Sequence, residues 1–421
     1  MNILNLPNLN PDGKIIFKNF SYLSLLRVFN ILSQYILVSF LVRTLGGETY
    51  GVFVWAFSII QYLVIIVNFG FNTYAAKYVS EENNDPHKIN QVFSTIMGIK
   101  ISLFILSSII FLISLNFFPL LQENTFLLVI LLGFAFGEAI FPIWFFQGSE
   151  KLEIPTKIIF VFRLLLVITT LWLITQTEHL LRYAFLLTIS QILIGFSGLN
   201  YAITKFDIKL VWFKLSNVTE LLKESFAFFL GGIFGKSFNF AAIMLIGIFC
   251  SMKDVSSFDI SFKIIAVMQL PFETLSVALF PTIARTKNLL LNQKVIFIGF
   301  LVSLLFWAFT YWQAEFLMNL LGGSELREYS YLLQRLSILI PVVVLTYLLG
   351  PNTLIAFGYQ NHFNYSFIIS ATIYILILLI FWKTGSLNFE IIIISRILVD
   401  VMMALYRLIV AIKYRLIFVS R

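Results

Sequence analysis

Charged side chains are scarce in this sequence. Asp, Glu, Lys and Arg make up 12% of its 421 residues, whereas 59% are hydrophobic and the mean hydropathy is +0.93. A typical soluble domain carries about 25% charged residues, and the connections between the apolar segments here are too short to fold as soluble domains. The composition therefore excludes an ordinary soluble protein.

Cysteine and histidine are nearly absent, and so are the motifs of common enzymes. Cys250 is the only cysteine, and His87, His179 and His362 lie far apart in the sequence. One thiol cannot make a disulfide framework or a thiolate metal cluster. The sequence also lacks the HExxH, GxSxG, GxGxxG and P-loop patterns that hydrolases and nucleotide-binding proteins use. We therefore expect neither an enzyme nor a resident metal or cofactor.

Long apolar segments dominate the chain. A hydrocarbon core about 30 Å thick needs about 20 apolar residues per helical span, and segments of that length recur throughout the sequence. They are continuous rather than alternating, which predicts an all-α polytopic membrane protein with twelve transmembrane helices. The predicted spans are residues 18–42, 50–73, 92–117, 125–147, 157–175, 181–203, 222–250, 256–284, 294–319, 331–357, 361–382 and 388–412.

Basic residues are concentrated in one set of the loops between these spans. The alternate loops hold only Arg43, Lys253, Arg327 and Lys383. Because Lys and Arg near helix ends stay on the cytoplasmic side, we expect a bacterial inner-membrane protein with both termini in the cytoplasm. The net charge of +8 is then a topology signal, and nucleic acid is not expected as a partner.

Short sequence matches half a chain apart indicate an internal repeat. Residues Arg27–Asn30 match Lys236–Asn239, and Pro142 matches Pro351 at the same offset. Transporters are often built from two related halves, and six spans per half predict parallel repeats. Such a pair is expected to enclose a central cavity that opens alternately to either side. The predicted halves are residues 1–215 and 216–421.

Charges inside predicted spans point to function, because each is costly at the bilayer centre unless it faces water or a partner. Arg27 and Lys236 occupy equivalent positions in the two halves and are predicted to face each other. Two cations repel unless an anion joins them, and a pyrophosphate would supply that anion. The alternative is that each cation pairs with a carboxylate such as Glu138 or Glu273.

Other polar residues in the spans allow more than one interpretation. Asn30 and Asn239, close to the two matched cations, are expected either to bind sugar hydroxyls or to hold helices together. Arg407 is expected to extend toward the cytoplasmic surface. Energy would come from an ion gradient or the membrane potential. The candidate sites for H⁺ or Na⁺ coupling are Glu138, Asp259, Glu273 and Asp400.

Two pairs of opposite charges have the i, i+4 spacing that places side chains on one helix face. Arg396 and Asp400 are expected to form a structural ion pair in preference to a coupling site. For Asp259 and Lys263, an ion pair and a role in the cavity both remain open.

Four stretches of the chain resemble a known transporter superfamily. The segment Phe258–Arg285 is similar to the eighth helix of flippases in the multidrug/oligosaccharidyl-lipid/polysaccharide exporter superfamily. The segments Leu45–Gly51, Phe69–Lys77 and Trp144–Lys151 resemble the Wzx-type O-antigen flippases within it. The resemblance extends over essentially the whole chain. The two extra C-terminal helices of lipid II flippases are not expected here, so that narrower assignment is disfavoured.

The resemblance implies translocation of an undecaprenyl-pyrophosphate-linked oligosaccharide from the cytoplasmic to the periplasmic face, for O-antigen or capsule assembly. In related flippases basic residues line a cationic cavity, and the matching positions here are Arg27, Lys236 and Lys263. Relatives often have Arg at the last two positions, where this chain has Lys. Because Lys lacks the planar fork of Arg, the argument for a bidentate phosphate contact is weaker there. The implied partners are membrane lipids and polysaccharide polymerase or chain-length proteins. The protein itself is expected to be a monomer.

Two other functions fit the same hydropathy. A drug or cation antiporter of the superfamily would share the architecture, but its cavity should favour carboxylates over basic residues. An O-antigen polymerase or ligase would be a membrane enzyme with a large periplasmic loop. The longest predicted non-cytoplasmic loop here, near Asn319–Ser330, has only about a dozen residues.

Overall fold

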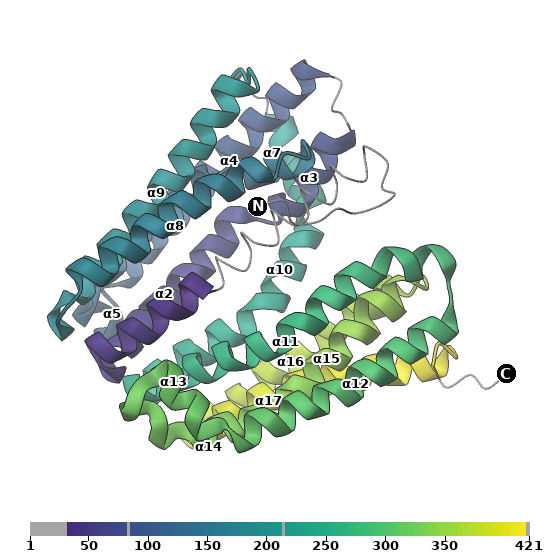
Figure 1. Cartoon of the computed structure of the whole chain (residues 1–421). Coiled ribbons are helices and arrows are strands. Elements are labelled where there is room, and N and C mark those ends of the chain that lie inside the picture. The colour runs from purple at the N-terminus through teal and green to yellow at the C-terminus, as the bar shows by residue number, and fades with distance from the viewer. Residues whose placement is uncertain (1–31, 82–84, 213–214, 418–421) are drawn as a thin grey trace, which may run out of the picture. The chain divides into compact units, whose positions relative to one another are not determined.

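The computed structural model describes residues 32–81, 85–212 and 215–417, and in this part of the chain all regular structure is helical (Figure 1). Residue contacts divide it into two compact units. Unit 1 comprises the described residues up to Phe40 together with Leu63–Phe229. Unit 2 comprises Leu41–Tyr62 and the described residues from Leu230 onward. The helices α2 (Gly47–Asn68) and α10 (Leu215–Phe249) have residues in both units.

The prediction of an all-helical membrane protein is confirmed. Eight described helices are long and apolar enough to cross a membrane, and a ninth span counts if the pair Ala314–Leu336 and Leu339–Ile355, bent by 43°, crosses as one. Leu32–Leu45 and Phe238–Phe249 are shorter apolar helices. Twelve spans in two bundles stay a prediction. The eight candidates are Gly47–Glu81, Pro86–Ser114, Thr125–Gly148, Glu153–Leu173, Thr177–Lys205, Met252–Thr286, Leu289–Trp312 and Gln360–Lys383.

Unit 1 is a bundle in which α9 packs against both α6 and α8, and α6 packs against α4. The α6–α9 contact is close because glycine lies at it. A Cβ added to Gly137 would lie 2.7 Å from the carbonyl of Gln191, so only glycine allows this approach. Its further helices are α3 (Phe71–Glu81), α4 (Pro86–Ser114), α5 (Pro119–Glu123), α6 (Thr125–Ile140), α7 (Ile143–Gly148), α8 (Glu153–Leu173), η1 (Thr177–His179) and α9 (Leu180–Lys205).

Proline breaks the helix between α6 and α7. Pro142 has no backbone N–H, and it forces the residue before it out of the helical region. Phe141 accordingly has an extended backbone, with φ −81° and ψ 113°. The short helix α7 then places Trp144, Phe145 and Phe146 in the core of the unit, where they are almost fully buried.

Unit 2 is organised around α15, which packs against α11, α12 and α17. Its helices start at side-chain caps: Ser251 forms a capping box with Asp254 at the start of α11, and Asn388 accepts from the Ile391 amide at the start of α17. Its further helices are α11 (Met252–Thr286), α12 (Leu289–Trp312), α13 (Ala314–Leu326), η2 (Arg327–Tyr329), α14 (Ser330–Leu336), α15 (Leu339–Leu349), η3 (Gly350–Ile355), α16 (Gln360–Lys383) and α17 (Phe389–Lys413).

A second proline marks the end of α15. The α-helix stops at Leu349, and Pro351 lies in the π-helical turn η3 that follows. Pro142 and Pro351, matched by the sequence repeat, therefore both stand where a helix loses its regular hydrogen bonding. The predicted halves 1–215 and 216–421 themselves stay a prediction.

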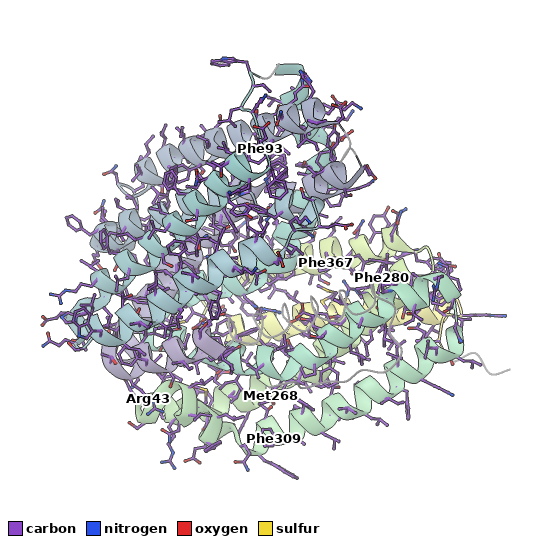
Figure 2. The ribbon with its side chains drawn as sticks, turned by 45° about the horizontal axis from the view of Figure 1, so that its top comes forward. Arg43, Phe93, Met268, Phe280, Phe309 and Phe367 are labelled. Atoms are coloured by element: carbon purple, nitrogen blue, oxygen red, sulfur yellow. The ribbon has the colours of Figure 1, made fainter. Side chains whose placement is uncertain are left out.

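Large apolar side chains cover the outer faces of both units. Trp172 on α8 is 78% exposed, and Phe309 on α12, labelled in Figure 2, is half-exposed. Such surfaces would be costly in water and are expected where lipid is the solvent.

Candidate functional site

A lysine and an aspartate on α11 form a polar cluster in unit 2. The Lys263 ammonium contacts both carboxylate oxygens of Asp259. The Tyr50 hydroxyl, from α2, donates to the same carboxylate at 2.8 Å. Asp259 is buried and the Lys263 side chain is 19% exposed. The charge of Lys263 is therefore balanced, while its ammonium still lies close to the surface of the unit.

Backbone packing explains why Tyr50 reaches this pair. The next residue, Gly51, lies directly against the carbonyl of Met252, and any side chain there would collide with it. Glycine thus lets α2 approach the first turn of α11. The capping box at Ser251 fixes where α11 starts, so that Asp259 comes two turns later on the side facing Tyr50.

A second cluster joins α10 to α17 in unit 2. Arg396 donates through Nη1 to Asp400 at 2.6 Å and through Nε to the Asn239 side-chain oxygen at 2.8 Å. The guanidinium also lies over the Phe262 ring, 5.2 Å from its centroid. Arg396 and Asp400 are both buried. The predicted structural ion pair is present, and Asn239 holds two helices together in this structure.

The remaining acidic candidate of unit 2 is Glu273 on α11. Its side chain is half-buried, and it lies close enough to Tyr347 on α15 to interact electrostatically, as Asp400 does from α17. Gln269, one turn earlier on α11, donates to the Leu339 carbonyl at 2.9 Å. The three helices α11, α15 and α17 therefore share a polar interior.

Glu138 lies in unit 1, apart in sequence from the other candidates. Its carboxylate accepts from the Gln191 side chain at 2.9 Å. The fully buried Lys100 on α4 donates to the Glu138 carbonyl at 2.9 Å and to the Phe141 carbonyl at 3.2 Å. Within the described residues, the carboxylates predicted to couple an ion thus fall into separate clusters, one in unit 1 and the others in unit 2.

Part of the predicted cationic site falls outside the described residues. This applies to Arg27 and Asn30, and to the side chain of Lys236, whose backbone belongs to α10. Of the three predicted phosphate-binding cations, the structure therefore places Lys263 alone. The pairing of Arg27 with Lys236 stays a prediction.

Sequence reasoning missed one buried cation, Lys100, and misplaced another, Arg407. Lys100 was not among the predicted in-span charges, although it lies in the predicted span 92–117 and the cost of a buried charge could have identified it. Arg407 was expected to reach the cytoplasmic surface, and that prediction is wrong: it is 2% exposed. It donates to the Ser366 hydroxyl at 2.9 Å and to the Thr346 carbonyl at 2.7 Å.

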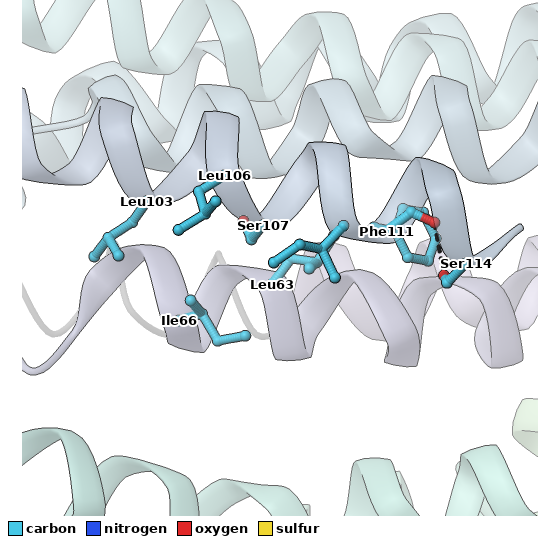
Figure 3. Close-up of a pocket in the computed structure, with 8 residues that line it drawn as sticks. Leu63, Ile66, Leu103, Leu106, Ser107, Phe111 and Ser114 are labelled. Carbon is cyan, nitrogen blue, oxygen red and sulfur yellow. Dashed lines mark hydrogen bonds between the residues drawn. The ribbon is translucent and has the colours of Figure 1, made fainter.

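An apolar groove of about 290 Å³ lies between α2 and α4 in unit 1 (Figure 3). Leu63 and Ile66 line one side, and residues of α4 line the other. Its serines are already engaged: Ser107 and Ser114 donate to carbonyls of their own helix at 3.2 and 2.6 Å. The groove is therefore suited to hydrocarbon rather than to a sugar or phosphate. In the described part of the chain, no three His, Cys, Asp or Glu side chains gather as a metal site.

Comparison with known protein families identifies the family of this chain. Residues 16–287, well over half of the chain, match the family described as "Polysaccharide biosynthesis protein". The chain belongs to this family. A "Putative O-antigen transporter" of Escherichia coli (strain K12) is 25% identical over 288 residues, which are 68% of this chain and 68% of that protein. A protein of the same name from Shigella dysenteriae is 21% identical over 280 residues, 66% of this chain and 70% of its own length.

Solved transporters share the fold of this chain at low sequence identity. The lipid II flippase MurJ, in an inward closed conformation, matches with a TM-score of 0.75 at 15% identity, over 92% of this chain and 87% of that one. An inward-facing multidrug resistance MATE family transporter of the MOP superfamily matches with a TM-score of 0.73 at 13% identity, over 93% and 94%. These matches show that the fold is shared, and the named relatives of the chain are transporters, in agreement with the prediction that the chain is not an enzyme.

Proposed function

We propose that this protein is a flippase that carries undecaprenyl-pyrophosphate-linked oligosaccharide repeat units across the bacterial inner membrane, for O-antigen or capsule assembly. The observation that carries the proposal is the family match over residues 16–287, together with the O-antigen transporters named among the relatives. Twelve helices in two six-helix halves, with both termini in the cytoplasm, would provide alternating access. The substrate would cross unchanged, with its polyprenyl tail in lipid.

Lys263 is proposed to contact the pyrophosphate together with Arg27 and Lys236. In the absence of substrate its ammonium is held by Asp259. A phosphate oxygen that takes over this ammonium leaves the Asp259 carboxylate buried without its counter-charge, which is unfavourable. A proton or Na⁺ that neutralises Asp259 would remove the cost. Of the four acidic candidates, Asp259 is therefore the one at which substrate and coupling ion would be linked.

A complementation experiment tests the function. A strain that lacks its own O-antigen flippase would receive the wild type, Lys263→Gln, or the matched variant Lys253→Gln at equal protein levels. Lys253 is on the same helix but forms partly exposed ion pairs with Glu328 and Glu325, so its loss costs little. We expect wild type and Lys253→Gln to restore surface polysaccharide, and Lys263→Gln to lower it about tenfold or more, because a charge-assisted phosphate contact is lost.

The fold is shared with MATE transporters, so an ion-coupled drug or cation antiporter is the competing function. Expression of the wild type in a drug-sensitive strain separates the two. Increased resistance to cationic drugs without restored polysaccharide would overturn the flippase proposal. A polymerase or ligase gains no support from the named relatives, which are transporters.

A further inference from the structure

The break between α6 and α7 surrounds a buried ammonium with oxygen atoms. Lys100 is fully buried, and its Nζ lies 2.9 Å from the Glu138 carbonyl oxygen and 3.2 Å from that of Phe141. The Glu138 carboxylate is close enough to attract it. The Gln191 amide group, from α9, holds that carboxylate in place at 2.9 Å. Three helices thus contribute to one small polar site inside unit 1.

The chain geometry explains why oxygen atoms are available there. Pro142 cannot donate to the carbonyl of Glu138, four residues earlier, and the extended Phe141 turns its own carbonyl out of the helix. Carbonyls at the end of a broken helix carry the negative end of the helix dipole. In ion-coupled transporters, unwound carbonyls and helix C-terminal ends are the groups that coordinate Na⁺. A carboxylate beside them completes the ligand chemistry of a monovalent cation.

We propose that the α6–α7 break is a monovalent-cation site that Lys100 occupies permanently, as a cation tethered to α4. The ammonium satisfies the carbonyls of Glu138 and Phe141 and balances the Glu138 carboxylate. A free ion cannot enter while the lysine is there. Glu138, one of the four candidates for ion coupling, then faces a fixed positive charge, which favours the three candidates in unit 2 as the site of the coupling ion.

The inference concerns the purified protein without substrate, so its test is independent of the proposed transport function. Lys100→Ser removes the tether and leaves space among the oxygen atoms. The full-length variant would be purified in detergent, and its melting temperature measured in NaCl, KCl and choline chloride at equal ionic strength. The matched control is Lys88→Ser, an exposed position in the first turn of the same helix.

The expected result is selective rescue by small cations. Wild type and Lys88→Ser should melt at the same temperature in all three salts. Lys100→Ser should melt about 5 °C or more below wild type in choline chloride, and regain at least about half of that loss in Na⁺ or K⁺ with a saturable dose response. Adding Glu138→Gln to Lys100→Ser should abolish the response, because the carboxylate ligand is gone.

If Lys100→Ser can be purified, either of two results would overturn the inference. One is a Lys100→Ser protein that melts equally in the three salts. The other is a salt response that persists after Glu138→Gln is added. If Lys100→Ser fails to accumulate in the membrane, the negative charge of Glu138 beside the empty site is the expected cause. The double variant Lys100→Ser, Glu138→Gln should then accumulate. Equal failure of both proteins would also contradict it.

Discussion

The two proline breaks pose the same backbone problem, and the two units solve it differently. Pro142 cannot donate to the Glu138 carbonyl, and Pro351 cannot donate to that of Tyr347. In unit 1 the buried Lys100 ammonium donates to the first carbonyl at 2.9 Å. In unit 2 the neutral hydroxyl of Ser276 donates to the second at 3.0 Å. One break thus depends on a charge, and the other depends on a hydroxyl.

A cation is still present near the break in unit 2, but one residue away and in a different setting. Arg407 donates to the Thr346 carbonyl at 2.7 Å, and its guanidinium lies beside the rings of both Phe363 and Phe367, 4.5 and 4.8 Å from their centroids. Phe367 is labelled in Figure 2. Aromatic faces and the more distant Asp400 carboxylate together balance this charge, whereas in unit 1 the Glu138 carboxylate acts on Lys100 without an aromatic ring from the described residues. The two matched prolines therefore both lie at a helix break, while the side chains that stabilise the two breaks differ.

Replacing the ammonium of unit 1 should have the largest effect. Lys100→Met keeps the length of the side chain but leaves two buried carbonyls without their donor and removes a positive charge beside Glu138. We expect a loss of about 3–5 kcal/mol in the free energy of unfolding, because two buried carbonyls lose a charged donor and a nearby carboxylate loses a positive charge. Thermal unfolding in detergent, with the exposed Lys88→Met as control, measures it. A loss equal to that of the control would show that the charge does not stabilise the break.

Removing the Arg407 guanidinium in unit 2 should lower the free energy of unfolding by a smaller amount. Arg407→Met loses hydrogen bonds to Ser366 and Thr346 together with the contacts to two aromatic rings. We expect a loss of about 2–3 kcal/mol. The exposed Lys413→Met on the same helix is the control, and the same melting experiment applies. If Arg407→Met destabilised the protein more than Lys100→Met, the contrast between the units would be reversed.

Removing the Ser276 hydroxyl in unit 2 should have the smallest effect on the free energy of unfolding. Ser276→Ala removes one neutral hydrogen bond to the Tyr347 carbonyl, for an expected loss of about 1 kcal/mol. Ser256→Ala, equally buried on the same helix, is the control because its hydroxyl donates to Lys253 in its own helix turn. A loss from Ser276→Ala as large as that from Lys100→Met would mean that charge makes no difference between the two breaks.

The sequence predicts local relationships well and distant ones poorly. Helix-forming apolar runs and i, i+4 charge pairs are local, so the ion pairs of Asp259 with Lys263 and of Arg396 with Asp400 could be anticipated and are present. Asn239 could not be assigned, because its partner Arg396 lies 157 residues further along the chain.

The missed cations show why such contacts escape prediction. The acceptors of Lys100 are backbone carbonyls 38 and 41 residues away, and a carbonyl looks the same at every position of a sequence. Arg407 is buried because α16 supplies Phe363, Phe367 and Ser366 around it. Hydropathy alone cannot reveal that arrangement, so a cation near a helix end was expected to reach the surface.

Translocation in proteoliposomes tests the central proposal most directly. An undecaprenyl-pyrophosphate-linked oligosaccharide would be incorporated with purified protein, and the sugar protected inside would be followed by its exposure to an added glycosidase. We predict that wild type and Lys253→Gln expose the inner pool far faster than protein-free liposomes do, and that Lys263→Gln slows exposure about tenfold or more. A wild-type rate no higher than that of protein-free liposomes would contradict the proposed function.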